Sequence, residues 1–347
     1  MDLTFALDNI SEPWLLMLGG LIAGTLFGAF AQQSRFCLRA AALEFAHGRF
    51  GVRLSVWLLA FSAAVLGTQI LVELGEIQAQ EARQLASPQS LSGAAIGGLL
   101  FGAGMVLARG CASRLLVLSA TGNLRALLSG LVFAVIAQAS LRGIFKPLRE
   151  WLAGLWTTAD IGGNDLVAHL GMSFWMILGL GLVWFATGVL IAVRAKMKLW
   201  QALAACLAGL VIPLAWWFTS SMSQQAFDPV QVEGITFTGP SADTLMLFLS
   251  PTPYALDFGI GLVPGVFAGS FLAAFLSREL SLQGFDGGRS MARYGAGAAL
   301  MGFGGMLAGG CAVGAGITGA SIVALTAWIT LSAIWLSASV TDRLLSD

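Results

Sequence analysis

A run of 48 residues without a charged side chain, residues 294–341, constrains this chain more than any other feature. As a single helix it would be about 72 Å long at 1.5 Å per residue, whereas the hydrocarbon core of a bilayer is about 30 Å thick. The run therefore predicts two membrane-spanning segments in succession. Because glycine disfavours helix, we expect the break between them in the glycine-rich residues 309–320.

The composition extends this prediction to the whole chain. Hydrophobic residues make up 57% of it and charged residues 10%, and the mean hydropathy is +0.83, whereas a soluble domain carries roughly 25% charged residues. We predict an all-α polytopic membrane protein with a single domain over residues 1–347. The net charge of zero gives no general attraction to nucleic acid. The first residues lack the positive region of a cleavable signal peptide.

Charge-free windows predict nine transmembrane helices. They are residues 13–32, 54–72, 91–109, 124–141, 171–193, 199–219, 257–277, 294–310 and 319–339. An odd number places the termini on opposite sides, and 14 of the 18 basic residues share a side with the C-terminus. The positive-inside rule then predicts an N-terminus outside and a C-terminus inside.

One phrase occurs twice at an offset of 200. Residues 102–112 read GAGMVLARGCA and residues 302–312 read GFGGMLAGGCA. In the nine-span topology the third span runs inward and the eighth runs outward. This predicts an inverted internal repeat, with halves of approximately 13–141 and 199–339, whose Gly-Cys breaks form re-entrant segments at a site near the membrane midplane.

The glycine breaks also predict the chemistry of that site. Irregular backbone is tolerated at membrane depth only where it lines a cavity or is buried in protein. The N–H groups and the dipole of the helix that follows a break favour an anion, expected at residues 112–120 and near 319–321. A thiol adds a soft, weakly donating group that suits a sulfur atom. The predicted substrate-binding residues are Cys37, Arg109, Gly110, Cys111, Gly310 and Cys311.

Packing is the competing interpretation for each of these residues. A cysteine in a membrane helix is usually a small apolar residue, and we interpret Cys206 in that way. The glycines of the first span fit close helix packing. Arg109 is replaced by Gly309 in the second copy, so the arginine is not among the residues that the two copies share. The inner arginines Arg35, Arg39, Arg109 and Arg114 are either topology determinants or a source of attractive potential for an anion.

Two further features limit the alternatives. The four cysteines form no C-x-x-C pair and only two histidines are present, so we expect no zinc site and no other cofactor. Residues 221–256 form the longest predicted outer loop, and the apolar, proline-broken residues 244–256 are expected to be interfacial or re-entrant.

At these phrases the chain resembles the YeeE/YedE family. Ser-Arg-Phe-Cys37 after a glycine-rich first span, together with the two phrases that end in Cys111 and Cys311, carries the resemblance, which covers about residues 14–329. The resemblance implies an hourglass-shaped inner-membrane permease for thiosulfate. It implies a path lined by Cys37, Cys111 and Cys311, along which S–H···S contacts pass the ion without covalent chemistry. It also implies a cytosolic sulfur-carrier partner of the TusA type.

The resemblance leaves some alternatives open. Arg109 departs from the family phrase, which has a small residue there, so the width or charge of the inner constriction is open. One alternative function is a permease for another sulfur or selenium species, such as sulfite or sulfide. The other is a membrane-embedded thiol sulfurtransferase, which would need a nucleophilic thiolate. We predict a transporter rather than an enzyme.

Overall fold

The structure is a computed structural model that describes residues 3–250, 255–285 and 287–346, and it contains helices and loops with no named β-strand in this part of the chain. A helix of 17 to 27 residues lies at each of the nine predicted positions. These helices are α2 (Glu12–Ser34), α4 (Val52–Glu73), α6 (Leu91–Leu107), α8 (Leu124–Leu141), α11 (Phe174–Arg194), α12 (Leu199–Gln225), α14 (Phe258–Leu276), α15 (Gly288–Leu307) and α17 (Leu325–Ser346).

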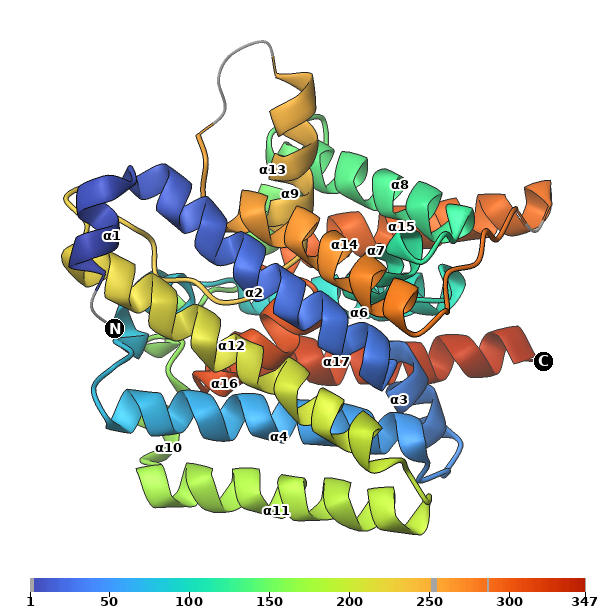
Figure 1. Cartoon of the computed structure of the whole chain (residues 1–347), viewed down its shortest axis with the longest axis horizontal. Helices are drawn as coiled ribbons and strands as arrows, with labels where there is room; N and C mark the ends of the chain where they lie inside the picture. Colours follow the sequence, from blue (N-terminus) through green and yellow to red (C-terminus); the bar gives the residue numbers. More distant parts are fainter. Residues whose placement is uncertain (1–2, 251–254, 286, 347) are drawn as a thin grey trace.

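Shorter helices connect the long ones. They are α1 (Thr4–Asn9), α3 (Leu38–Ala46), η1 (Ala79–Glu81), α5 (Arg83–Ala86), α7 (Ala112–Ala120), α9 (Lys146–Ala153), η2 (Thr158–Ile161), α10 (Leu166–Leu170), α13 (Thr238–Leu249), η3 (Ala312–Thr318) and α16 (Gly319–Ser321). Most of the long helices run side by side, with the N-terminus at the left end of the bundle and the C-terminus at the right end (Figure 1).

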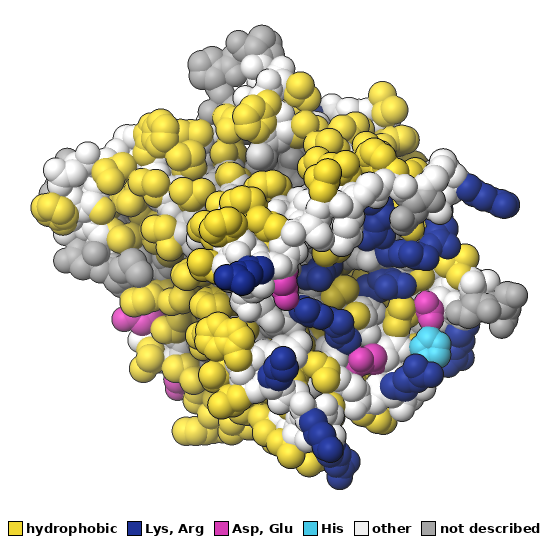
Figure 2. Space-filling view, turned by 45° about the vertical axis from the view of Figure 1, so that its right-hand side comes forward, with side chains coloured by type: hydrophobic (Ala, Val, Ile, Leu, Met, Phe, Trp, Pro, Cys, Tyr) yellow, Lys and Arg dark blue, Asp and Glu magenta, His cyan; other side chains and the backbone are white. Residues whose placement is uncertain are grey.

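The membrane character of the chain is confirmed. In the described residues, seven helical segments are long and apolar enough to cross a membrane. An eighth is added if α15 and the η3–α16 pair, which meet at a 40° bend, count as one span. The nine-span topology stays a prediction. Hydrophobic side chains cover much of the surface, whereas Lys and Arg gather at the end of the bundle that holds the C-terminus (Figure 2).

Glycines on α2 and α14 let the two helices pack with their backbones in contact. A Cβ on Gly24 would lie 2.3 Å from the carbonyl oxygen of Leu262, and a Cβ on Gly265 would lie 2.4 Å from that of Leu21. No real side chain fits at such distances, so both positions require glycine. The packing interpretation of the first-span glycines is therefore confirmed.

The two helices of the repeated phrase, α6 and α15, contact each other reciprocally. A Cβ on Gly97 would lie 2.5 Å from the Gly304 carbonyl oxygen, and a Cβ on Gly104 would lie 2.5 Å from that of Gly297. Residue numbers rise along one helix as they fall along the other, so the helices are antiparallel. In the repeat, Gly97 corresponds to Gly297 and Gly104 corresponds to Gly304, at the offset of 200. Each of the two first-copy glycines therefore contacts the counterpart of the other one.

The predicted break in the long apolar run is present, with one correction. Helix α15 ends at Leu307, and α17 begins only at Leu325. Helical structure resumes at Ala312 rather than near residue 319. The first turn, η3, is a wide π-helical turn in which the Gly316 N–H bonds to the Cys311 carbonyl at 3.4 Å. In the first copy, α7 occupies the predicted residues, Ala112–Ala120.

The predicted outer loop contains a buried segment. Helix α12 extends to Gln225, and residues 232–238 then run inward, with Val232, Ile235 and Phe237 almost fully buried. Helix α13 follows and packs against α8, α14 and α15. Residues 251–254 lie outside the described residues, and the interfacial or re-entrant character of residues 244–256 stays a prediction.

Candidate functional site

Three of the four cysteines occupy the same local structure. Cys37, Cys111 and Cys311 are each the N-cap residue of a short helix, α3, α7 and η3 respectively. Two residues before each cysteine the backbone is left-handed, with φ of +56° at Arg35, +56° at Arg109 and +77° at Gly309. A left-handed residue ends a helix, and the next helix begins at once. The repeated phrase thus forms the same turn at Cys111 and Cys311, and the structure contains a third such turn at Cys37.

The break at Cys311 is covered by the buried segment before α13. The Cys311 thiol is 1% exposed, and its sulfur accepts a hydrogen bond from the Gly314 N–H at 3.4 Å. The Phe237 backbone also interacts with this thiol. The Thr318 hydroxyl donates to the Ile235 carbonyl at 2.7 Å, which ties the segment to η3. The thiol, a weak acceptor, and the glycine amide that donates to it thus lie together at the start of a helical turn.

A cavity of about 650 Å³ contacts this break from the N-terminal end of the bundle. We call it the acidic cavity because Glu12, Asp228, Glu233, Asp243 and Asp257 line it with only Arg83 and Arg149 as basic residues. Gly309 and Gly310 form part of its wall, and the Arg83 guanidinium donates to the Gly309 carbonyl at 3.3 Å. Arg83 therefore connects the charged lining of the cavity to the Cys311 turn.

Glu233 is the most perturbed carboxyl group in the acidic cavity. Burial, and then repulsion from Asp257, raise the pKa of Glu233 to about 7, against the attraction of Arg83. Burial also raises the pKa of Asp257. Hydrogen bonds between the Thr219 side chain and the Glu233 backbone hold this segment to α12, at 2.7 Å and 3.2 Å. Glu233 is thus a half-buried group that titrates near neutral pH.

The thiols of Cys37 and Cys111 lie together and interact directly. Cys111 is 1% exposed, and its sulfur lies 3.4 Å from the Ser113 hydroxyl oxygen. The positive charge of Arg114 acts on both thiols. The Nη1 atom of Arg114 is buried and has no hydrogen-bond partner among the described residues. A thiol pair with an adjacent unpaired guanidinium nitrogen is a suitable environment for a soft anion.

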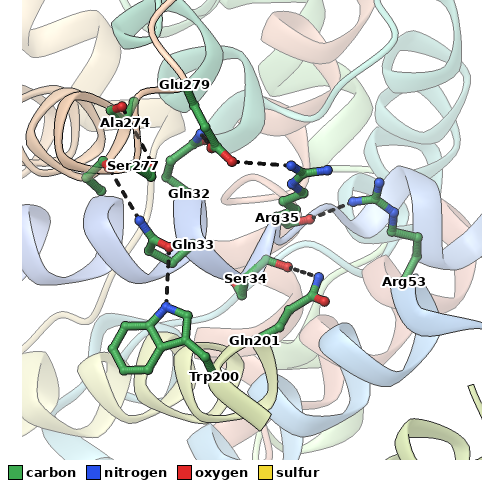
Figure 3. A network of polar contacts seen from close by, with 11 residues as sticks. Gln32, Gln33, Ser34, Arg35, Arg53, Trp200, Gln201, Ala274, Ser277 and Glu279 are labelled. Carbon is green, nitrogen blue, oxygen red and sulfur yellow. Dashed lines mark hydrogen bonds and ion pairs between the residues drawn. The ribbon is translucent and has the colours of Figure 1, made fainter. Parts of the chain in front are cut away.

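A polar network fixes the turn that carries Cys37 (Figure 3). Arg35 forms an ion pair with Glu279 at 3.3 Å, and the Gln32 amide donates to the same carboxylate at 2.8 Å. Arg53 donates to the Arg35 carbonyl at 3.4 Å. Arg35 is therefore engaged with the end of α14, which makes it a structural residue of the α2–α3 turn.

A second cavity, of about 340 Å³, lies beyond the thiol pair. We call it the arginine cavity, and Arg39, Arg109, Asn123, Arg125, Gln283 and Gly284 line it. Two hydrogen-bonded loops build one wall, in which the Gln283 N–H donates to Gly122 at 3.0 Å and the Leu124 N–H donates to Gln283 at 3.1 Å. Of the four inner arginines considered in the sequence, Arg39 and Arg109 face this cavity.

The predicted site residues thus fall into two groups. Cys37, Cys111 and Arg109 belong to the end with the arginine cavity, together with Gly110, which packs beside Leu115. Cys311 and Gly310 lie at the end of the bundle that holds the acidic cavity. Between the groups, the Phe27 ring packs against Phe36, at 6.2 Å between centroids, and against Phe237, at 5.5 Å.

Sequence reasoning missed several residues of these cavities. Glu233 and Thr236 come from a loop whose depth no periodicity reveals. Arg125 was seen only as a boundary residue of a span. The one available signal for Arg125 was its position in the first turn of α8, directly after the helix that Cys111 begins.

Comparison with known proteins decides the family. The family model described as "Sulphur transport" matches residues 33–340. The chain belongs to this sulphur transport family. It is 27% identical over 336 residues to the thiosulfate transporter TsuA of Escherichia coli strain K12, covering 91% of each chain. It is 28% identical over 325 residues to the thiosulfate transporter TsuA of Spirochaeta thermophila, covering 89% of this chain and 93% of that protein. The resemblance to the YeeE/YedE family is thereby confirmed.

Proposed function

We propose that this protein is a permease that takes up thiosulfate across the bacterial inner membrane. Its family, the names of its relatives and its membrane-spanning helices support transport rather than catalysis. The observation that carries the proposal is the same helix break at Cys37, Cys111 and Cys311, with one break against the acidic cavity and two beside the arginine cavity.

In this proposal thiosulfate enters from the acidic cavity and meets Cys311 first. The Gly314 N–H at the Cys311 sulfur supplies a donor for an anion, and the thiol supplies a soft contact for the terminal sulfur. The ion then passes the aromatic rings around Phe27 and reaches the thiol pair of Cys37 and Cys111. Thiols bind more weakly than ammonium groups do, which suits a path that must also release its ion.

We further propose that the two copies of the repeated phrase form an inverted repeat with re-entrant Gly-Cys segments. The antiparallel, reciprocal glycine contacts between α6 and α15 support this arrangement. The concentration of Lys and Arg at the C-terminal end of the bundle supports a periplasmic N-terminus and a cytoplasmic C-terminus (Figure 2). A TusA-like sulfur carrier is the proposed partner at this cytoplasmic face, on the strength of the family resemblance.

The test is uptake of labelled thiosulfate by cells that lack their own importers. Cys111→Ala and Cys311→Ala are expected to abolish uptake while the protein still inserts in the membrane. Cys206→Ala is the matched control, because Cys206 lies half-buried within α12 rather than at a helix break, and it should transport normally. Normal uptake by a well-inserted Cys111→Ala or Cys311→Ala variant would remove the thiols from the mechanism.

The same assay separates the alternatives. Thiosulfate labelled on both sulfur atoms should arrive with the sulfurs still joined, whereas a sulfurtransferase would separate them and leave a persulfide on a cysteine. Competition by unlabelled sulfite, sulfide or selenium anions measures the selectivity of the path. A competitor that blocks uptake at lower concentration than thiosulfate itself would replace thiosulfate as the proposed substrate.

A further inference from the structure

Among the described residues, the arginine cavity is lined by three arginines and by no carboxylate. Its lining includes Arg39, Arg109 and Arg125, which come from three different elements. Arg293, on α15, adjoins them through the Tyr294 ring. The ion pairs found between described residues involve none of these four arginines. Asp342 attracts Arg39 at longer range, but it contacts His47 at 3.5 Å.

Tyr294 organises three of these guanidinium groups. Its ring is 1% exposed, and the guanidinium carbons of Arg109, Arg125 and Arg293 lie 5.8, 4.9 and 5.7 Å from its centroid. The negative face of an aromatic ring attracts cations at such distances. The three like charges are therefore held within about 12 Å of each other.

Two buried nitrogen atoms leave this cluster incomplete. The Nε atoms of Arg39 and Arg293 are buried and have no hydrogen-bond partner among the described residues. A buried donor without a partner is unfavourable, and one attached to a cation more so. Arg109 adds a second cost, because its φ of +56° is a conformation that glycine adopts easily, as Gly309 does in the second copy. The presence of an arginine in place of a glycine at this turn is explained if its positive charge has a function, such as binding an anion.

We propose that Arg39, Arg109 and Arg125 form a binding site for a small divalent oxyanion, of the class that includes thiosulfate and sulfate. Guanidinium forks match the oxygen atoms of such anions in geometry and charge. The Asn123 side chain, held by its bond to Gln283 and by accepting the Ala126 N–H at 2.8 Å, gives the site a rigid polar wall.

The position of the site assigns its role. Arg39 is two residues after Cys37, and Arg109 is two residues before Cys111, so the site adjoins the thiol pair at both turns. This role as the receiving site for the transported ion rests on the proposed function, whereas the binding itself does not. Part of the lining is exposed, namely Arg109, Gln283 and Gly284. The phosphate of a lipid headgroup has the same chemistry as a free oxyanion, and the lipid arm of the test below separates the two.

The test is calorimetric titration of sodium sulfate, and separately of thiosulfate, into the full-length protein purified in a neutral detergent without anionic lipid. Sulfate is expected to bind the wild type and the Cys206→Ala variant alike. Arg125→Gln and Arg39→Gln should each weaken binding by about tenfold or more, the size expected for a lost charged hydrogen bond. Arg194→Gln is the matched control, since Arg194 is an exposed basic residue at the end of α11.

Several results would overturn the proposal. One is unchanged sulfate affinity in both Arg125→Gln and Arg39→Gln. Another is an equal loss of sulfate affinity in Arg194→Gln, which would indicate a general electrostatic attraction by basic residues rather than a binding site. In a third arm, phosphatidylglycerol is added in nanodiscs. If that lipid displaces sulfate completely at low mole fraction, the site belongs to a headgroup phosphate. Failure of this proposal leaves uptake by the thiols intact, whereas normal uptake by Cys111→Ala would refute the proposed function and leave sulfate binding measurable.

Discussion

Replacing Glu233 by Gln is expected to remove most of the pH dependence of thiosulfate uptake around neutrality. Glu233 lines the acidic cavity next to the Cys311 turn, and its pKa is raised to about 7 by burial. A carboxyl with a raised pKa is mostly neutral below that value and mostly ionised above it. Thiosulfate stays a dianion throughout this range. The repulsion between Glu233 and the ion therefore grows as the pH rises.

The size of the effect follows from the titration. With a pKa of about 7, the neutral fraction of Glu233 is about 90% at pH 6 and about 10% at pH 8. If the neutral form admits the dianion, the uptake rate at low thiosulfate falls about tenfold over these two pH units. The other charges that act on Glu233 are Arg83, Asp243 and Asp257. Glu12, Asp228 and Arg149 also line the cavity.

The assay is the initial uptake rate into proteoliposomes with equal pH on both sides, so that no proton gradient contributes. Glu233→Gln should give a nearly flat profile at the level of the wild type near pH 6. Glu81→Gln is the control, because Glu81 is an exposed residue of η1 and should keep the wild-type profile. If Glu233→Gln retains the tenfold fall, Glu233 does not control entry and the reasoning is refuted.

Two further predictions concern the thiol pair and the helix packing. Diamide should oxidise Cys37 and Cys111 to a disulfide, with both thiol hydrogens passing to diamide, so that only two of the four cysteines react with maleimide in the denatured protein until dithiothreitol is added. Cys37→Ser should lose no further thiol under diamide, and a wild type that keeps all four would contradict the contact. Gly104→Ala should cost about 1–3 kcal/mol through overpacking, because its Cβ would lie 2.5 Å from the Gly297 carbonyl oxygen. Gly179→Ala, with open space around its Cβ, should leave the thermal unfolding midpoint nearly unchanged, and an equal shift in both variants would argue against the close α6–α15 contact.

Hydropathy and glycine content predicted the parts of this fold that depend on local sequence. A long helix lies at each predicted span, the apolar run breaks after Leu307, and α7 occupies residues 112–120. These features follow from the thickness of a bilayer and from the low helix propensity of glycine, which act within one segment. The error at the second break has a local reason too, since the glycine-rich residues after Cys311 form a wide π-helical turn where the sequence favoured no helix.

The parts that the sequence did not predict depend on contacts between distant segments. The segment around Phe237 reaches Cys311 only because Thr219 and Thr318 hold it. The arginine cavity depends on Tyr294, which brings together side chains from residues far apart in the chain. No periodicity encodes such convergence. The resemblance implied one path lined by Cys37, Cys111 and Cys311, but not that Cys37 and Cys111 lie together, and the part of the three thiols in transport stays a proposal.

The left-handed turn before each cysteine has a consequence for directionality. If the route consisted only of identical copies of this turn, the electrostatic potential along it would be symmetric, and an anion would not be drawn to either end. One contribution to the asymmetry here is within the repeat itself, since the turn carries a guanidinium at Arg109 and no side chain at Gly309. The potential for an anion is therefore more favourable at the end that holds Arg109, and this one difference between the two copies gives the proposed route a direction.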